Sequence, residues 1–398
     1  MKTSFLYPLA FVACIACGKG GSNNNSGTAP VISIPDVTVN EGTGGTNNVD
    51  VTLTLDKATS KQVTVTYSTV EGTAKHGTDF TQVTSQQVVF QPNEKEKKVT
   101  IAVVADDIKE AEEAFSIQFI NPVNAILQKT TVIVTLKNDD IKVGFNNAGF
   151  DAPNSYPGYT LKWSDEFNGT ELANDAWSYE SGDGCPGVCG WGNNELQYYT
   201  APPNNLFFQD GKMIIEAKAE TFGGKNYTSS RIITRGKKSF KYGRIDIRAI
   251  LPKGKGLWPA LWLLPQDNVF GGWPKSGEID LMENIGSEQS RVSGTLHYGP
   301  GPGSIWISRG YTLPSGTFND GFHVFSLEWK QDQIQWLVDG NVYSTLTKND
   351  IGGNNWPFNE SFFFIMNFAV GGNLPGSPDA TTSFPNWFII DYIRIYQQ

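Results

Sequence analysis

The chain is poor in charged residues and poorer still in cysteine, histidine and methionine. Charged residues make up 18% of its 398 residues, with four Cys, three His and four Met. Asp and Glu outnumber Lys and Arg by 40 to 31, which gives a formal charge of −9, and no basic run occurs. A partner bound through phosphates, such as nucleic acid, is therefore disfavoured. Glycine (42) and aromatic residues (12%) are abundant instead, which disfavours disorder and coiled coil and favours a neutral, polar partner.

The N-terminal segment has the pattern of an export signal. Its apolar run at 5–16 is too short to cross a bilayer but is typical of a secretory signal. The run ends beside Cys17, ahead of a polar stretch at 18–30, and this pattern resembles a bacterial lipobox, although no Leu stands three residues before the Cys. We predict a lipoprotein signal at 1–17, acylation of Cys17 with Cys14 as the alternative, and a flexible tether at 18–30. The protein would then touch a membrane only through a lipid anchor at the cell envelope, with plain secretion as the alternative.

Tryptophan and arginine are absent from the first 140 residues, whereas all 11 Trp and all seven Arg lie beyond them. A stretch rich in Gly, Asn and Pro at 144–158 accompanies this change in composition. We therefore predict two folded domains, at 31–140 and 156–398, joined by a linker at 141–155.

The first predicted domain alternates apolar and polar residues with a period of two. Such runs are separated by Gly, Asn and Asp clusters, which predicts a β-sandwich of about 110 residues. The segment resembles a Calx-β domain, an immunoglobulin-like sandwich, in the motifs Val39-Asn-Glu-Gly, Glu71-Gly-Thr-Ala-Lys-His-Gly-Thr-Asp-Phe80, Asn121-Pro and Asn138-Asp-Asp140. The resemblance implies that loop carboxylates could bind Ca²⁺, which takes six to eight oxygens, although the same carboxylates could merely solubilise the loops. The candidate acids are Glu41, Asp79, Asp106, Asp107, Glu110, Glu112, Asp139 and Asp140.

The second predicted domain is also all-β. Strand-like runs such as Met213-Ile-Ile-Glu-Ala and Phe362-Phe-Phe-Ile-Met recur, and no amphipathic pattern extends beyond two helical turns. A β-domain of roughly 240 residues this rich in aromatics is a large sandwich or jelly roll.

The segment Gly277-Glu-Ile-Asp-Leu-Met-Glu-Asn-Ile-Gly286 concentrates carboxylates on one strand. Side chains i and i+2 share a face, so Glu278 and Asp280 point the same way, but strict alternation turns Glu283 away and puts Met282 beside the acids. A β-bulge, one extra residue in the strand, returns Glu283 to the acidic face and lets Met282 pack in the core. The two Glu Cα atoms would then lie roughly 13 Å apart, from where leaning side chains can reach the ~5–5.5 Å carboxyl separation of retaining glycosidases.

Three acids on one face predict chemistry rather than surface charge. Like charges in a shared cleft raise one pKa, which places a proton donor beside an ionised nucleophile, as acetal cleavage requires. The alternative, a charged outer face of an exposed strand, would be destabilised by three neighbouring carboxylates. Residues that suit sugar binding occur around the motif, since sugars present apolar CH faces and hydroxyl groups. These candidates are Asn193, Trp258, Trp262, Trp273 and His297.

Residues 159–398 resemble glycoside hydrolase family 16, in its laminarinase-like branch. The motifs that follow the family's order are Trp163-Ser-Asp-Glu-Phe-Asn-Gly, Gly190-Trp-Gly-Asn-Asn-Glu, Ser230-Arg-Ile-Ile-Thr-Arg, Tyr242-Gly-Arg-Ile-Asp-Ile-Arg, Gly277-Glu-Ile-Asp-Leu-Met-Glu, Asn367-Phe-Ala-Val-Gly-Gly and Asp391-Tyr-Ile-Arg-Ile-Tyr. The resemblance implies a concanavalin A-like β-jelly roll with a concave cleft, and Arg231 is a further candidate for substrate binding. It also implies retention of configuration, with Glu278 as nucleophile, Glu283 as acid/base and Asp280 as electrostatic helper, without a cofactor for catalysis. The bulged, Met-containing motif is that of the β-1,3-glucanase branch.

Two further features concern stability. Members of this family often carry a structural Ca²⁺ on the convex face, and the resemblance implies that its ligands here are Glu166, Gly211 and Asp391. Cys185 and Cys189 are four residues apart and could form a small loop disulfide in an exported protein. A zinc site at these cysteines would need two further ligands, and none is in reach.

We therefore expect a monomeric endo-β-1,3-glucanase that hydrolyses laminarin-type glucan by double displacement. One alternative is a hydrolase of another β-glucan or an algal galactan, such as lichenan, agar or carrageenan. A sulfated galactan would require basic residues around the cleft, and no basic cluster surrounds the acidic motif. The other alternative is a non-catalytic glycan-binding surface protein, which the presence of all three acids disfavours.

Overall fold

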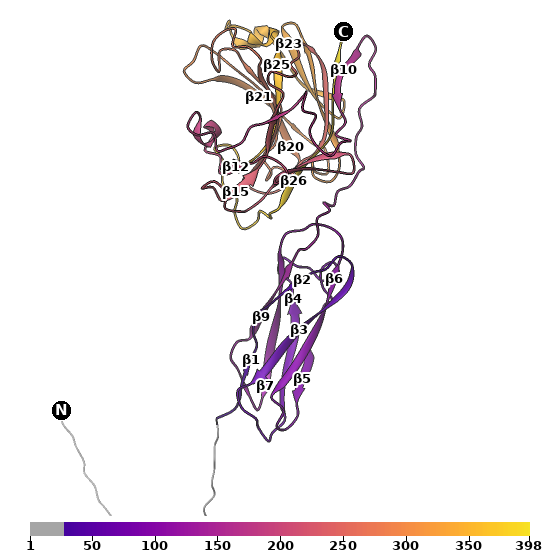
Figure 1. Cartoon of the computed structure of the whole chain (residues 1–398), viewed down its shortest axis with the longest axis vertical. Coiled ribbons are helices and arrows are strands. Elements are labelled where there is room, and N and C mark those ends of the chain that lie inside the picture. The colour runs from indigo at the N-terminus through magenta and orange to yellow at the C-terminus, as the bar shows by residue number, and fades with distance from the viewer. Residues whose placement is uncertain (1–27) are drawn as a thin grey trace, which may run out of the picture. The chain divides into compact units, whose positions relative to one another are not determined.

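The computed structural model describes residues 28–398, whose regular secondary structure is almost entirely β-strand (Figure 1). The predicted all-β class is therefore confirmed. Contacts divide the chain into two compact units: the second comprises Lys137–Gln398 with the loops Asn40–Gly45 and Ala105–Glu112, and the first comprises the other described residues. No helix within 28–398 is long and apolar enough to cross a membrane. The predicted acylation site, Cys17, lies outside the described residues.

The first unit is a β-sandwich of two sheets, with the strand orders β6-β3-β1-β8 and β2-β9-β7-β4-β5. Alternate residues face inward: in β4 the side chains of Val63, Val65 and Tyr67 are buried, as the period of two predicts. These inward residues form one apolar core. The strands are β1 (Val31–Ser33), β2 (Val37–Asn40), β3 (Gly45–Leu55), β4 (Val63–Val70), β5 (Gln86–Phe90), β6 (Glu96–Ala105), β7 (Glu113–Val123), β8 (Ile126–Leu127) and β9 (Thr131–Lys137).

The second unit is a jelly roll of two large sheets. The first sheet has the order β13-β14-β26-β17-β22-β23-β24, with β10 paired to β26, and the second has the order β11-β16-β25-β18-β19-β20-β21. The strands of the first are β10 (Thr160–Asp165), β13 (Leu206–Gln209), β14 (Lys212–Ala217), β17 (Gly243–Ile250), β22 (His323–Lys330), β23 (Gln333–Val338), β24 (Asn341–Thr347) and β26 (Asn386–Gln397).

The second of these sheets is called the cleft sheet below. Its strands are β11 (Ser178–Tyr179), β16 (Arg231–Ile233), β18 (Leu257–Pro265), β19 (Glu278–Glu283), β20 (Arg291–Tyr298), β21 (Ile305–Thr312) and β25 (Phe362–Val370). A small parallel pair, β12 (Gln197–Tyr199) and β15 (Tyr227–Ser229), and three short 3₁₀ helices, η1 (Cys189–Gly192), η2 (Lys348–Ile351) and η3 (Pro357–Asn359), complete the unit.

Strand β25 explains how the cleft sheet is covered on both faces. All nine of its residues are buried, so it reads as a continuous apolar run rather than an alternating one. Phe364 and Met366 belong to the main core, whereas Phe363 and Ile365 belong to a separate cluster that packs against Trp262. Successive residues of β25 therefore point in turn to the core face of the sheet and to the opposite face, which carries Trp262.

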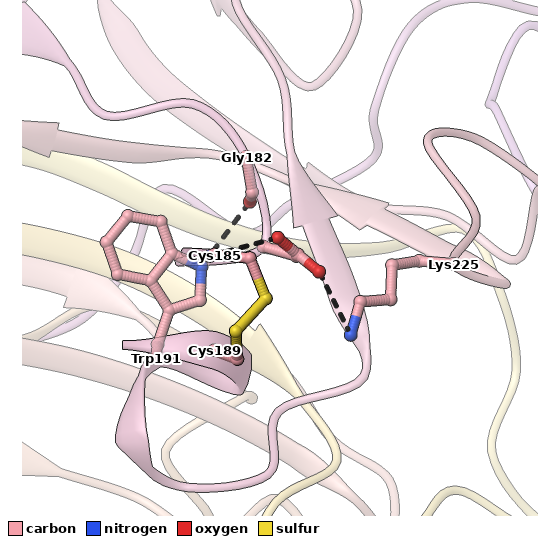
Figure 2. The surroundings of a disulfide bond; sticks show 6 residues. Gly182, Cys185, Cys189, Trp191 and Lys225 are labelled. Atoms are coloured by element: carbon pink, nitrogen blue, oxygen red, sulfur yellow. Dashed lines mark hydrogen bonds and ion pairs between the residues drawn. A yellow bond between two sulfur atoms is a disulfide. The ribbon is translucent and has the colours of Figure 1, made fainter. Parts of the chain in front are cut away.

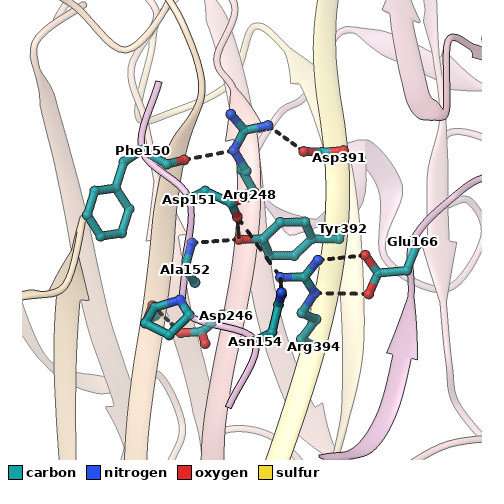
Figure 3. A network of polar contacts seen from close by, with 12 residues as sticks. Phe150, Asp151, Ala152, Asn154, Glu166, Asp246, Arg248, Asp391, Tyr392 and Arg394 are labelled. Carbon is teal, nitrogen blue, oxygen red and sulfur yellow. Dashed lines mark hydrogen bonds and ion pairs between the residues drawn. The ribbon is translucent and has the colours of Figure 1, made fainter. Parts of the chain in front are cut away.

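The segment predicted as a linker, 141–155, packs instead on the first sheet of the jelly roll (Figure 3). Val143 joins an apolar cluster with Phe322, and Ala152 packs against Tyr392. The Tyr392 hydroxyl donates to Asp151 at 2.7 Å and accepts the Ala152 N–H at 3.0 Å. The composition of this segment is turn-like, but its few apolar residues are sufficient to hold it against the sheet.

The predicted calcium ligands are held by cationic side chains in this structure (Figure 3). Arg394 donates two hydrogen bonds to the Glu166 carboxylate, at 2.9 and 2.8 Å. The Asp391 carboxylate accepts from Arg248 through one oxygen and lies 2.9 Å from the Lys212 ammonium through the other. A Ca²⁺ ion requires free oxygens, and the neighbouring positive charges oppose it. The Glu166 and Asp391 carboxylates therefore do not fit the calcium site that the resemblance implied at Glu166, Gly211 and Asp391.

Replacement of Asp391 tests this correction. We expect Asp391→Ala to lower the free energy of unfolding by about 2 kcal/mol, because Arg248 is buried and would lose its partner carboxylate. The loss should be the same with and without added Ca²⁺, measured by thermal unfolding. Asp175→Ala, which removes an exposed carboxylate paired with Lys238, is the control and should change little. A calcium-dependent rise in melting temperature that disappears only in Asp391→Ala would restore the metal site.

Candidate active site

Strand β19 carries the predicted β-bulge. Against β18, Asp280 pairs with Trp262 and Met282 pairs with the adjacent Leu261, so Leu281 is an extra residue in the ladder. Against β20, the register shifts between Asp280 and Glu283. Leu281 and Met282 are both buried in the main core, which leaves the acids on the opposite face. The bulge inferred from the sequence is confirmed, and it accommodates two consecutive core residues.

A buried tryptophan supports the bulge from the core side. Trp336 donates its Nε1–H to the Asp280 carbonyl oxygen at 2.9 Å. The indole can approach because Gly294, on the neighbouring strand, has no side chain: a Cβ there would lie 2.3 Å from Trp336. The backbone carbonyl beside the bulge is thereby satisfied, as buried polar groups require.

Tryptophan and histidine side chains hold the three carboxylates. Trp273 donates its indole N–H to Glu278 at 2.7 Å, and Trp258 donates to Glu283 at 3.2 Å. His297 Nε2 lies 3.3 Å from the Asp280 carboxylate and 3.7 Å from that of Glu278. Trp258, Trp273 and His297 therefore orient the acids, and sugar binding by them stays a prediction.

Burial shifts the pKa values of all three carboxyl groups, and a neighbouring carboxylate adds to the shift of Glu278 and of Asp280. Burial, and then the neighbouring Asp280 carboxylate, raises the pKa of Glu278 to about 8. Burial, and then the charge of Glu283, raises the pKa of Asp280 well above its usual value, and burial also raises that of Glu283. The site consequently retains protons at neutral pH that isolated carboxylates would lose, which is the condition for a proton donor beside a nucleophile.

Trp262 lies on β18, which flanks β19 on the side away from β20, and a buried chain of hydrogen bonds fixes its position. Its indole N–H donates to Asn367 Oδ1 at 2.7 Å, and the Asn367 amide donates to the Tyr199 hydroxyl at 2.9 Å. Tyr199 in turn donates to Glu195 at 3.1 Å, and Gln197 donates to the same carboxylate oxygen at 2.6 Å. Asn367, Tyr199 and Glu195 are not among the predicted site residues, although Glu195 lies in the motif that contains Asn193 and Asn367 begins another of the family motifs.

Arg231 packs against Trp262 on the same face of the sheet. Its guanidinium lies over the rings of Trp191 and Trp262, 4.4 and 4.9 Å from their centroids, and donates to Glu180 at 2.6 Å. Arg231 thus packs two aromatic rings together and is only in part available to a ligand. Asn193 lies in the loop after η1, where its carbonyl accepts the backbone N–H of Asn373 at 2.7 Å.

Cys185 and Cys189, the candidate disulfide, are joined in the structure (Figure 2). Asp183 accepts the backbone N–H of Cys185 at 3.1 Å and pairs with Lys225 at 3.6 Å. Trp191, two residues after the disulfide, packs against Tyr199 and Arg231. The small cross-linked loop therefore places one of the two rings on which Arg231 stacks.

The acidic loops after β6 and β9 contain a second group of carboxylates. Asp140 is buried, at 7% exposure, and its Oδ2 has no hydrogen-bond partner among the described residues. Burial, and then the charge of Asp139, raises the pKa of Asp140, with smaller contributions from Asp106 and Asp107. Oxygen donors of this kind suit a hard divalent cation, and calcium binding by these loops stays a prediction.

Comparisons with known proteins match the two halves of the chain separately. The family model described as Glycosyl hydrolases family 16 matches residues 194–388, and that described as Calx-beta domain matches residues 24–141. The Beta-glucanase of Rhodothermus marinus is 39% identical over 267 residues, which cover 65% of this chain and 92% of that protein.

Two further relatives have similar coverage of this chain. The Glucan endo-1,3-beta-glucosidase A1 of Niallia circulans is 44% identical over 265 residues, which cover 61% of this chain and 38% of that protein. This chain therefore spans well under half the length of that relative. The crystal structure of the laminarinase catalytic domain from Thermotoga maritima aligns with a TM-score of 0.56 at 45% identity, covering 60% of this chain and 98% of that one.

The match to the Rhodothermus marinus protein extends over nearly all of that relative, and the region that the family model matches, 194–388, includes the bulged strand with its three acids. A Calx-beta domain precedes it in the chain. On this similarity, the chain belongs to glycosyl hydrolases family 16.

Proposed function

We propose that this protein hydrolyses internal bonds of β-1,3-glucan with retention of configuration. The observation that carries the proposal is the bulge in β19, which puts Glu278, Asp280 and Glu283 on one face of the cleft sheet. The relatives reported above are named as a beta-glucanase, a glucan endo-1,3-beta-glucosidase and a laminarinase, which supports β-glucan as the substrate. The aromatic side chains beside the acids suit the apolar CH faces of a neutral sugar chain.

In the proposed first step, a Glu278 carboxylate oxygen attacks the anomeric carbon. The bond to the leaving oxygen breaks, Glu283 transfers its proton to that oxygen, and a glycosyl ester forms on Glu278. In the second step, Glu283 takes a proton from a water molecule whose oxygen attacks the same carbon and releases Glu278 as a carboxylate. Two inversions at one carbon give overall retention.

The hydrogen bonds of each acid favour these roles, whereas burial and Asp280 raise the pKa of Glu278 to about 8 and so limit the ionised fraction of the nucleophile at neutral pH. The short hydrogen bond from Trp273 stabilises the charged form of Glu278, whereas the contacts of Trp258 and Thr295 with Glu283 are longer, at 3.2 and 3.4 Å. Burial and the charge of Glu283 raise the pKa of Asp280, and a proton kept on Asp280 would reduce the negative charge next to Glu278. We infer that Asp280 assists by controlling charge rather than by contacting the leaving group.

Variants of the two glutamates should differ in kind on laminarin and on aryl β-glucosides. Glu278→Ala should lower kcat by more than about a thousandfold on both substrates, because no ester can form. Glu283→Ala should lose laminarin hydrolysis but still form the ester from aryl glycosides with good leaving groups, and azide should accelerate its turnover by giving a β-azide product.

The control for substrate class is the set of products that the parent protein releases from laminarin, lichenan and agarose. Efficient cleavage of agarose but not laminarin, or azide rescue of Glu278→Ala rather than Glu283→Ala, would contradict the proposal.

The pH profile tests the role of Trp273. The indole N–H lowers the pKa of Glu278, so Trp273→Phe should raise it and move the acidic limb of kcat/KM to higher pH, by about one pH unit for one charge-assisted hydrogen bond. Activity that requires the Glu278 carboxylate falls as pH decreases through this pKa. The matched variant Trp258→Phe removes the donor to Glu283 and should move the alkaline limb instead. An acidic limb that stays in place in Trp273→Phe would exclude this control of Glu278.

A further inference from the structure

Trp306 is the most exposed tryptophan among the described residues. Its exposure is 63%, compared with 54% for Trp273, and it lies on β21, the edge strand of the cleft sheet. A single exposed apolar residue needs no explanation on its own. The position of Trp306 relative to the acids provides the reason to assign it a role.

The strand register places Trp306 in line with the nucleophile. Glu278 pairs with His297 on β20, and His297 pairs with Trp306 on β21. Directly opposed residues of antiparallel strands project from the same face of a sheet. Trp306 therefore projects from the face that carries Glu278 and His297.

The alternation along β21 gives the same orientation independently. Ile307 and Tyr311 pack against the main core. Because side chains alternate along a strand, the even-numbered residues of β21, Trp306 and Ser308 among them, face the other way. Ser308, two residues after Trp306, accepts a hydrogen bond from Thr295 at 3.0 Å, and Thr295 also contacts Glu283. Trp306 and Ser308 thus share the acidic face.

Trp306 and Trp262 lie on opposite sides of the acids. Trp262 is on β18 and Trp306 is on β21, with the acidic strand β19 between them in the sheet order. Two strand spacings separate Trp306 from Glu278, which is about 10 Å. A sugar chain that is cut internally must extend to both sides of the broken bond, so it needs contacts in both directions from β19.

The surroundings of Trp306 favour a carbohydrate over a charged ligand. His297, in the same row, has its Nδ1 3.1 Å from the Ser304 hydroxyl, and its ring centroid is 6.3 Å from that of Trp273. The face beside Trp306 thus combines aromatic rings with hydroxyl and imidazole groups, as a sugar requires. Arg309, the nearby cation on β21, lies one residue out of phase and so belongs to the opposite face.

We propose that Trp306 is an aromatic platform for a sugar unit of the same β-glucan chain, on the side of the acids opposite to Trp262. This inference rests on the proposed function, because the occupant of the platform is the substrate itself. Trp306 acts on binding of the longer chain and on the position of cleavage, and it takes no part in bond breaking.

The test compares Trp306→Ala and Trp306→Phe with the parent on laminarin oligosaccharides of increasing length. Trp306→Ala should raise KM for a hexasaccharide roughly tenfold, with kcat little changed, and should shift the cleavage positions of an end-labelled hexasaccharide. Trp306→Phe should recover most of the affinity, because it restores a ring. Arg309→Ala, on the same strand and the opposite face, is the control and should match the parent.

The possible failures can be told apart. A parent that does not cleave laminarin would overturn the proposed function and this inference with it. A parent that cleaves laminarin, while Trp306→Ala shows parental KM and parental cleavage positions at every chain length, would overturn the platform alone. Melting temperatures of the variants separate loss of binding from loss of folding, and Trp306→Phe keeps the test valid if the alanine variant is unstable.

Discussion

The β-bulge in strand β19 is the constraint on which the catalytic unit depends. Leu281 and Met282 are adjacent in sequence and both belong to the core, whereas a regular strand would bury only one of them. The bulge resolves this conflict and at the same time returns Glu283 to the face of Glu278. Because Trp336 binds the carbonyl of Asp280, the core side of the strand also fixes the position of the acids.

The acids are held in an environment that opposes their charge. Burial raises the pKa of all three acids, and neighbouring carboxylates add to the shift for Glu278 and Asp280, so the folded protein is destabilised by their ionisation as pH rises above the range of an ordinary carboxylate. Indole N–H groups partly offset this cost for Glu278 and Glu283. The indoles of Trp273 and Trp258 therefore bind the carboxylates through their edges, and in the proposed function their faces contact the sugar.

The sequence predicts those features of the site that depend only on residues close together along one strand. The acidic face of β19 and its bulge follow from the spacing of Glu278, Asp280 and Glu283. The density of strand-like runs predicts a large sandwich or jelly roll, and the family resemblance implies the jelly roll. The chain from Trp262 through Asn367 to Tyr199 could not be predicted, because Asn367 and Tyr199 are 168 residues apart.

The same limit explains the two corrections. The segment at 141–155 has the composition of a linker, and only the fold shows that Phe322 and Tyr392 lie beneath it. Glu166 and Asp391 match the positions of calcium ligands along the chain. These carboxylates are paired instead with Arg394, Arg248 and Lys212. The pairing depends on the packing of strands that are distant in sequence, which the sequence alone does not reveal.

Deletion of Met282 tests the central claim most directly. It leaves Glu-Ile-Asp-Leu-Glu, in which plain alternation already places all three acids on one face, so the folded variant should keep measurable hydrolysis of laminarin. Insertion of one apolar residue beside Met282 should turn Glu283 away and remove activity. A folded deletion variant without activity, or an active insertion variant, would contradict the account that the bulge serves to align the acids.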